Sequence, residues 1–267
     1  MFWPGAKVVV SQMRKMTNKD KILIMCQSMA ACLIFLLSML FCSFLRPFLS
    51  SFIADPVWLM VILSIFPGLL TLIVLRNEGL VSLRQSFDFH VVKHSKAQVA
   101  QICLYSVLVI LGLNTLMEFV DLADNNAQNV SMLLGNPMGI LALIFVAPVV
   151  EELVFRESTI GRMLRGGLSP WTAIIFSSLL FGVVHANPAQ IPFASLMGIL
   201  LGYLYYRTGT LALPLFLHVL NNTLAVLLVL ICGEDASLLG MFGNDVIAIL
   251  AASVSCVVGC LGVARSV

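Results

Sequence analysis

The chain has 267 residues, of which 60% are hydrophobic and only 10% are charged, and its mean hydropathy is +1.03. Soluble domains carry about 25% charged residues, so this composition excludes a water-soluble domain and indicates a polytopic membrane protein. The net charge of +2, without a basic run interleaved with aromatic residues, excludes a nucleic-acid partner.

Eight apolar segments have roughly the length that a helix needs to cross a bilayer, which is about 20 residues. We therefore predict an all-α fold, a membrane bundle of about eight transmembrane helices. The first segment is too long for a signal-peptide core and is interpreted as a retained anchor. The segments lie near residues 21–45, 57–75, 99–120, 135–160, 170–186, 191–206, 211–232 and 244–264.

The basic residues indicate how these helices are oriented. With eight helices, every lysine and arginine except Arg46 lies on one side of the membrane. The positive-inside rule then places both termini in the cytoplasm. We expect a multi-pass protein of the bacterial cytoplasmic membrane, with N-terminal helices in 1–130 and a functional core in 131–267 within one integral membrane domain.

The longest polar connection, near residues 76–98, contains His90 and His94 at a spacing of four residues. On a helix this pair could bind a metal ion. We favour the simpler interpretation, which is that both are solvated loop histidines.

Two adjacent acidic residues, Glu151 and Glu152, lie inside the fourth apolar segment. A charged side chain at the bilayer centre costs about 3 kcal/mol, so such groups usually have a function. On a helix Arg156 faces Glu152, whereas Glu151 is rotated by about 100°. We predict a structural Glu152–Arg156 ion pair and a free Glu151 that is suited to general-base catalysis. Pro148 is expected to loosen this helix.

Polar residues in later segments can join Glu151. The run Gly166–Pro170 predicts a turn, about which Glu151 and His185 are nearly equidistant in sequence. His218 and Asn222 share a helix face four residues apart. We therefore expect one buried pocket to hold Glu151, His185, His218 and Asn222.

Two kinds of hydrolytic chemistry fit such a pocket. Glu151 and His185 could activate a water molecule while His218 and Asn222 donate hydrogen bonds to an oxyanion. Alternatively, Glu151, His185 and His218 could ligate a catalytic zinc ion. The spacing does not choose between them. Phe181 is interpreted as core packing or as a wall of the pocket.

Three motifs occur in order: EExxxR from Glu151 to Arg156, FxxxH from Phe181 to His185, and HxxxN from His218 to Asn222. With them, residues 145–225 resemble the CAAX-protease and bacteriocin-processing (CPBP) family of intramembrane proteases, which includes the type II CAAX prenyl endopeptidases.

The resemblance implies a helical intramembrane endopeptidase that acts near the cytoplasmic side on a membrane-associated peptide or protein. It implies that Glu151 is the catalytic base and that His185, His218 and Asn222 are its partners. The family is named a metalloprotease family, which makes zinc the implied cofactor, yet a metal-free mechanism has been proposed for members. The metal therefore stays open.

Two other functions were weighed. A non-catalytic membrane scaffold or a bacteriocin self-immunity protein could retain the motifs for stability. A proton-coupled transporter could use buried Glu and His residues as a relay, but inverted repeats are not evident. The sequence does not name the substrate, for which prenylated C-terminal peptides and leader peptides are both suitable.

Overall fold

The structure is a computed structural model that describes residues 17–81, 95–233, 237 and 243–267, and all regular elements in these ranges are helices. The all-α prediction is therefore confirmed. His90 and His94 lie outside the described residues. The elements are α2 (Asn18–Leu49), α3 (Pro56–Asn77), α5 (Lys96–Met117), α6 (Ala127–Leu134), α7 (Pro137–Leu141), η2 (Ala142–Val146), α8 (Ala147–Glu152), η3 (Leu153–Gly161), α9 (Arg162–Arg165), α10 (Pro170–Val183), α11 (Ile191–Thr208), α12 (Ala212–Cys232) and α13 (Asp245–Ser266).

The elements from α7 to α9 follow one another without a break and form a single helix, Pro137–Arg165, which we call the central helix. Each of the eight predicted segments coincides with a helix, the fourth of them with the central helix. The short helix α6 was not predicted.

Six helices of the described residues are long and apolar enough to cross a membrane: α2, α3, α5, the central helix, α12 and α13. Helix α10 is apolar but has only 14 residues. The chain is thus an integral, multi-pass membrane protein. The count of eight spans and the cytoplasmic position of both termini stay predictions.

Several helices begin at a short polar residue that is followed by proline. Asp55 accepts a hydrogen bond from the backbone of Val57, and Ser169 accepts one from Thr172. These caps satisfy free amides of the first turn, where a proline costs nothing because its missing N–H has no intrahelical partner. At Gly167 the backbone has φ 75°, which favours glycine, and the predicted turn before α10 is present.

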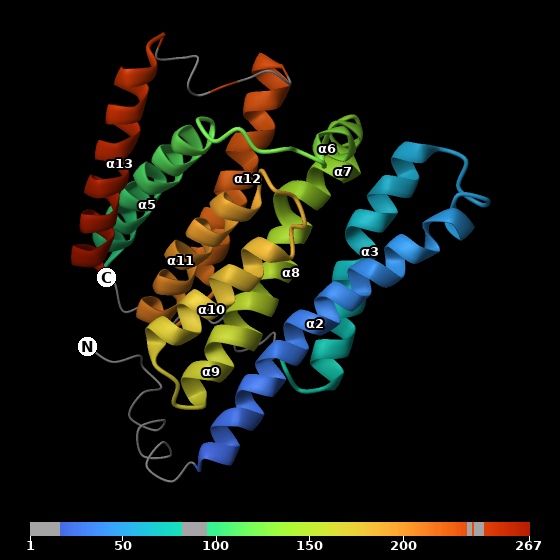
Figure 1. Ribbon diagram of the computed structural model, residues 1–267, viewed down its shortest axis with the longest axis horizontal. Helices are drawn as coiled ribbons and strands as arrows, with labels where there is room; N and C mark the ends of the chain where they lie inside the picture. The colour runs from blue at the N-terminus through green and yellow to red at the C-terminus, as the bar shows by residue number, and fades with distance from the viewer. Residues whose placement is uncertain (1–16, 82–94, 234–236, 238–242) are drawn as a thin grey trace.

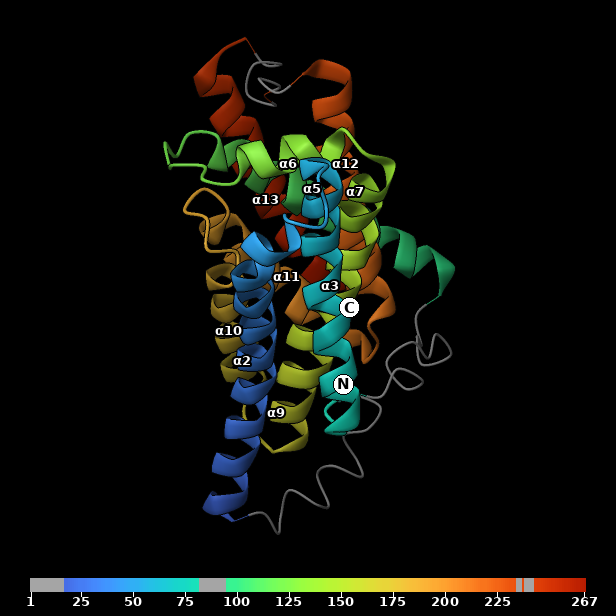
Figure 2. The same cartoon turned by 90° about the vertical axis from the view of Figure 1, so that its right-hand side faces the viewer.

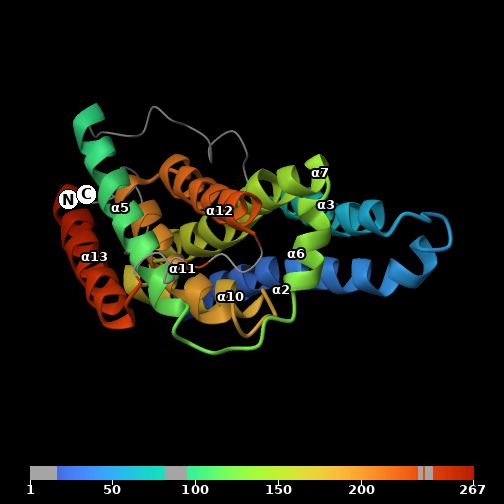
Figure 3. The same ribbon diagram turned by 90° about the horizontal axis from the view of Figure 1, so that it is seen from above.

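The helices form three groups (Figure 1). The pair α2 and α3 lies on one side of the molecule and the pair α5 and α13 on the other, as the view from above also shows (Figure 3). The central helix, α10, α11 and α12 lie between them, and α2 and α3 run antiparallel to each other (Figure 2). The central helix is therefore covered by other helices, and all nine residues of η3 are buried.

Helices α5 and α13 pack closely because glycines line their contact. A Cβ added at Gly259 would lie 2.7 Å from the Tyr105 carbonyl oxygen and 2.9 Å from the Val109 amide nitrogen. Only a residue without a side chain permits this approach of two helix backbones. The outward side chains of α13, such as Leu250 and Val254, are exposed, as expected of a face that contacts lipid.

Candidate active site

The central helix is widened before the two glutamates. In η2 the Ala147 amide donates to the Ala142 carbonyl, five residues back, instead of to Leu143. The next amide would belong to Pro148, which has no N–H. The Leu143 carbonyl therefore lacks its usual helical donor, and the side-chain amide of Asn222 on α12 donates to it at 2.9 Å. Pro148 thus loosens the helix as predicted, and Asn222 satisfies the carbonyl that becomes free.

This contact predicts an energetic coupling between Asn222 and Pro148. The Asn222→Ala variant should lose about 1 kcal/mol of unfolding free energy, because a half-buried carbonyl is left without a donor. In a Pro148→Ala background the same change should cost less, since residue 148 then supplies an N–H. Chemical unfolding of the four proteins of this double-mutant cycle, in detergent, measures the coupling. Equal costs in both backgrounds would contradict it.

A second widened stretch, η3, follows the glutamates. The Thr159 hydroxyl donates to the Val154 carbonyl at 2.9 Å, and the Ser177 hydroxyl on α10 donates to the Phe155 carbonyl at 2.8 Å. Irregular helical turns of this kind occur often at functional sites. Here they leave carbonyls that neighbouring hydroxyl groups satisfy.

Glu152 and Arg156 form the ion pair that their spacing predicts. Their side chains are 0% and 1% exposed, and Arg156 Nη1 lies 3.1 Å from Glu152 Oε1. Two opposite charges that are removed from water stabilise each other only while both are present. The pair therefore anchors the centre of the bundle.

His218 on α12 lies between the two glutamates. Its Nδ1 is 2.9 Å from Glu152 Oε1, and its Nε2 is 3.5 Å from Glu151 Oε2. Because the Glu152 carboxylate is an acceptor, Nδ1 carries the hydrogen and Nε2 is turned toward Glu151. Glu152 thus fixes the orientation of the His218 imidazole relative to Glu151.

The ring of Phe181 is the common contact of this group. The Arg156 guanidinium lies over its face at 4.5 Å, and the rings of His185 and His218 meet it edge-on with centroids 5.0 and 5.7 Å away. Phe181 is 2% exposed. The side chain is therefore both core packing and a wall of the site, so the two predicted readings describe one position.

His185 lies just beyond the end of α10 and is half-buried. Its Nδ1 is 2.7 Å from the Phe181 carbonyl oxygen. A carbonyl only accepts, so Nδ1 carries the hydrogen and Nε2 is left as an acceptor. In this tautomer, Nε2 can accept a hydrogen bond from a water molecule.

The arrangement differs from the predicted one in its pairings. Glu151 faces His218 at 3.5 Å, and both glutamates contact His218, whereas a free Glu151 was predicted. Asn222 is engaged with Leu143 and, through its side-chain oxygen, with the side chain of Asn221. The difference arises because α12 packs directly against the part of the central helix that carries the glutamates, a tertiary contact that the spacing of motifs does not contain.

The three proposed zinc ligands do not form a complete metal site. Among the described residues, no group of three His, Cys, Asp or Glu side chains is arranged to hold a metal ion. Glu151 and His218 face each other, but His185 does not complete the set. These residues do not fit a three-ligand zinc ion in this arrangement.

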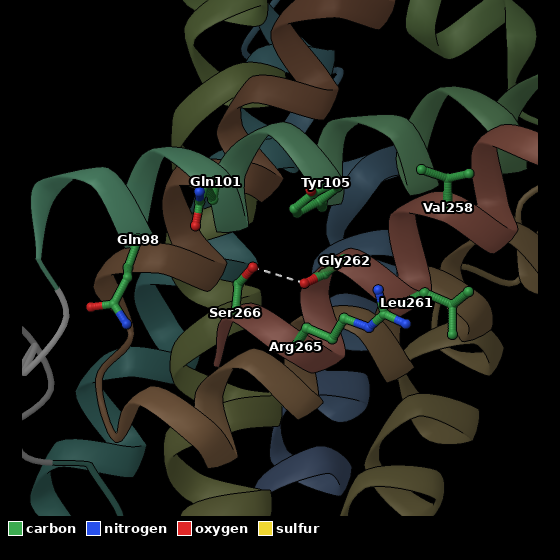
Figure 4. Close-up of a pocket in the computed structure, with 8 residues that line it drawn as sticks. All are labelled: Gln98, Gln101, Tyr105, Val258, Leu261, Gly262, Arg265 and Ser266. Carbon is green, nitrogen blue, oxygen red and sulfur yellow. Dashed lines mark hydrogen bonds between the residues drawn. The ribbon is translucent and has the colours of Figure 1, made fainter.

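A groove of about 460 Å³ lies away from this site (Figure 4). It runs between α5 and α13 and is lined by polar residues such as Gln101 and Arg265 and by apolar ones such as Leu261. It includes none of the candidate catalytic residues. The site is thus the buried Glu–His–Arg group, and the groove is a separate feature of the surface.

Comparison with known proteins finds similarity in the segment that carries the three motifs. Residues 134–224 match the family described as Type II CAAX prenyl endopeptidase Rce1-like. Over 106 residues, 40% of this chain, it is 29% identical to the putative membrane peptidase YdiL of Bacillus subtilis (strain 168), covering 43% of that protein. Over 97 residues, 29% of this chain, it is 34% identical to CAAX prenyl protease 2 of Arabidopsis thaliana, covering 31% of it. Over 140 residues, 51% of this chain, it is 26% identical to the membrane-embedded CAAX protease MroQ of Staphylococcus aureus (strain USA300), covering 57% of it.

The matches thus span between about a third and somewhat more than half of these relatives. No solved structure matches significantly. The fold and the site define a polytopic membrane protein with a buried glutamate–histidine centre. Over residues 134–224 the chain is similar to the Rce1-like type II CAAX prenyl endopeptidases, and its matched segments are similar to membrane peptidases and CAAX proteases.

Proposed function

We propose that the protein is an intramembrane endopeptidase that hydrolyses a peptide bond of a membrane-associated substrate. The observation that carries this proposal is the orientation of His218 by the buried Glu152–Arg156 pair, which turns one imidazole nitrogen toward Glu151. A carboxylate beside an oriented imidazole is a typical general-base arrangement. Glu151 is 15% exposed, so it is the member of the group that water can reach.

In the proposed mechanism Glu151 takes a proton from a water molecule that His185 Nε2 also holds. The water oxygen bonds to the scissile carbonyl carbon, and the carbonyl electron pair moves onto its oxygen. Once it holds this proton, the Glu151 carboxyl can donate to His218 Nε2, while the second N–H of the Asn222 amide donates a hydrogen bond to the oxyanion. When the intermediate collapses, the carbon–nitrogen bond breaks and the amine takes the proton from Glu151.

The substrate class follows from the surroundings of the site. The catalytic group lies among apolar helices, so a substrate that is anchored in the membrane would approach through lipid. A prenylated C-terminal peptide, as the name CAAX prenyl protease 2 suggests for the Arabidopsis relative, or a leader peptide would meet this requirement. Zinc dependence is left to experiment.

The proposal is tested by incubating the purified protein in detergent with quenched peptides, both lipidated and plain. Parallel reactions contain the Glu151→Gln variant, and each is run with and without a zinc chelator. Cleavage by the wild type alone is the expected result, and the cleaved peptides define the substrate class. Loss of cleavage with chelator, restored by added zinc, would show that the metal-free step is wrong.

The matched control is a folded Glu151→Gln protein with wild-type thermal stability. If neither protein cleaves any peptide, the endopeptidase proposal fails and the non-catalytic scaffold or self-immunity protein becomes the better account.

A further inference from the structure

The turn that carries His185 is tied to the connection between α5 and α6 (Figure 1). The Asn187 side-chain amide donates to Asp124 Oδ1 at 2.9 Å, and its oxygen accepts from the Asn125 backbone at 3.0 Å. The Ala189 amide donates to the Ala123 carbonyl at 3.3 Å. Two segments about 60 residues apart in sequence are therefore joined at one point, which we call the loop junction.

Asn187 contributes both its side chain and its backbone carbonyl to this junction. Its side chain is 2% exposed, and its backbone carbonyl accepts from the amides of Gln190 and Ile191, where α11 begins. A buried asparagine requires partners for its oxygen and its NH₂ group. Here both partners lie on the α5–α6 connection. Asn187 therefore links that connection to the start of α11.

The turn itself needs such support. Helix α10 ends at Val183, and Ala186 adopts φ 49°, a left-handed conformation that costs a non-glycine residue about 1 kcal/mol or more. A conformation of this kind persists only when its surroundings determine it. His185 lies between the regular helix and this strained residue, so the contacts of Asn187 hold the turn on the far side of His185.

We propose that Asp124 and Asn187 are positioning residues that set the place of His185 in the site. The imidazole contacts the Phe181 carbonyl, and the loop junction holds the backbone two residues after His185. This inference rests on the proposed endopeptidase function. It assigns a role to residues that lie outside the three motifs and that do not touch the reacting atoms.

The test exchanges the two side chains of the junction. Asn187→Asp places two carboxylates against each other and removes the amide donor, so His185 should shift and kcat should fall about 10- to 100-fold with little change in KM. The exchange variant, Asp124→Asn with Asn187→Asp, restores one amide and one carboxylate. Asp124 Oδ1 also accepts from the Asn126 backbone at 2.8 Å, so the amide at 124 must rotate to keep its oxygen on Asn126 and turn its NH₂ toward the carboxylate at 187. That carboxylate still accepts from Asn125, and part of the lost kcat should return.

A second readout does not depend on cleavage. Diethyl pyrocarbonate modifies neutral imidazoles, and mass spectrometry can follow His185 with free N-acetylhistidine, added to the same reaction, as the internal reference. The ratio of the two modification rates should change several-fold in Asn187→Asp and return in the exchange variant. Asp124 is exposed, so Asp124→Ala should fold and should change the ratio in the same direction.

Folded Asn187→Asp and Asp124→Ala proteins with wild-type kcat and a wild-type rate ratio would overturn the inference, as would an exchange variant that recovers neither. If the wild type cleaves no peptide while the ratio follows the junction, the proposed function fails and the positioning of His185 stands.

Discussion

Replacing Glu151 by glutamine is expected to lower kcat about 10²- to 10⁴-fold, the range that general-base catalysis contributes. Glutamine keeps the size and polarity of the side chain but accepts no proton at neutral pH. Since Glu151 is only partly buried and faces His218 at 3.5 Å, beyond a good hydrogen bond, its loss should leave stability almost unchanged. The measurement is the kcat for a cleaved peptide, with thermal unfolding of the same samples.

Glu157 provides the matched control on the same helix. It is buried too, but its partners are Tyr205 and Arg165 and it does not contact His218. The Glu157→Gln variant should therefore cleave nearly as well as the wild type once folded. Wild-type turnover by folded Glu151→Gln, or equal loss in both variants, would rule out Glu151 as the base.

Removing Arg156 should have the largest effect on stability. The Arg156→Ala variant leaves Glu152 buried without its cation, and breaking one side of such a pair costs about 3–5 kcal/mol. The change also removes the guanidinium from the face of Phe181. Activity should fall as well, because Glu152 would no longer hold His218 as it does now. Chemical unfolding in detergent measures the first effect and peptide cleavage the second.

A variant of Arg165 tests whether burial of the ion pair causes the loss of stability expected for Arg156→Ala. It forms an ion pair with Glu157 at 3.4 Å on the same helix, but its side chain is 40% exposed. Because Arg165 is partly in solvent, and Glu157 keeps its hydrogen bond from Tyr205, Arg165→Ala should be milder than Arg156→Ala. The double variant Glu152→Gln/Arg156→Met removes both charges and should unfold less easily than Arg156→Ala. If Arg156→Ala and Arg165→Ala cost the same, the buried pair is not the anchor described above.

The sequence predicted the helices well because length and hydropathy determine them. Each of the eight apolar segments is a helix, and the Glu152–Arg156 pair follows from a spacing within one helix. The pairing of Glu151 with His218 was not predicted, because it depends on how α12 lies against the central helix. Motif spacing contains no information about such contacts.

The contact of Asn222 with Leu143 was missed for a related reason. Pro148 signalled a loosened helix, but only the structure shows which carbonyl is left free and which side chain reaches it. Asn187 and Asp124 belong to no motif, and an Asn-Pro turn and an acidic loop residue are common in any chain. Their joining across about 60 residues becomes visible only when the two connections are placed side by side.

The central claim is that the Glu151–His218 group hydrolyses peptide bonds within the membrane. The most direct measurement reconstitutes wild type and Glu151→Gln in liposomes with a membrane-anchored peptide that the protein cleaves in detergent, and identifies new termini by mass spectrometry. The account predicts one pair of complementary fragments from the wild type, whose masses sum to the substrate plus one water, and none from the variant. The same fragments from both proteins, or none from either, would contradict it.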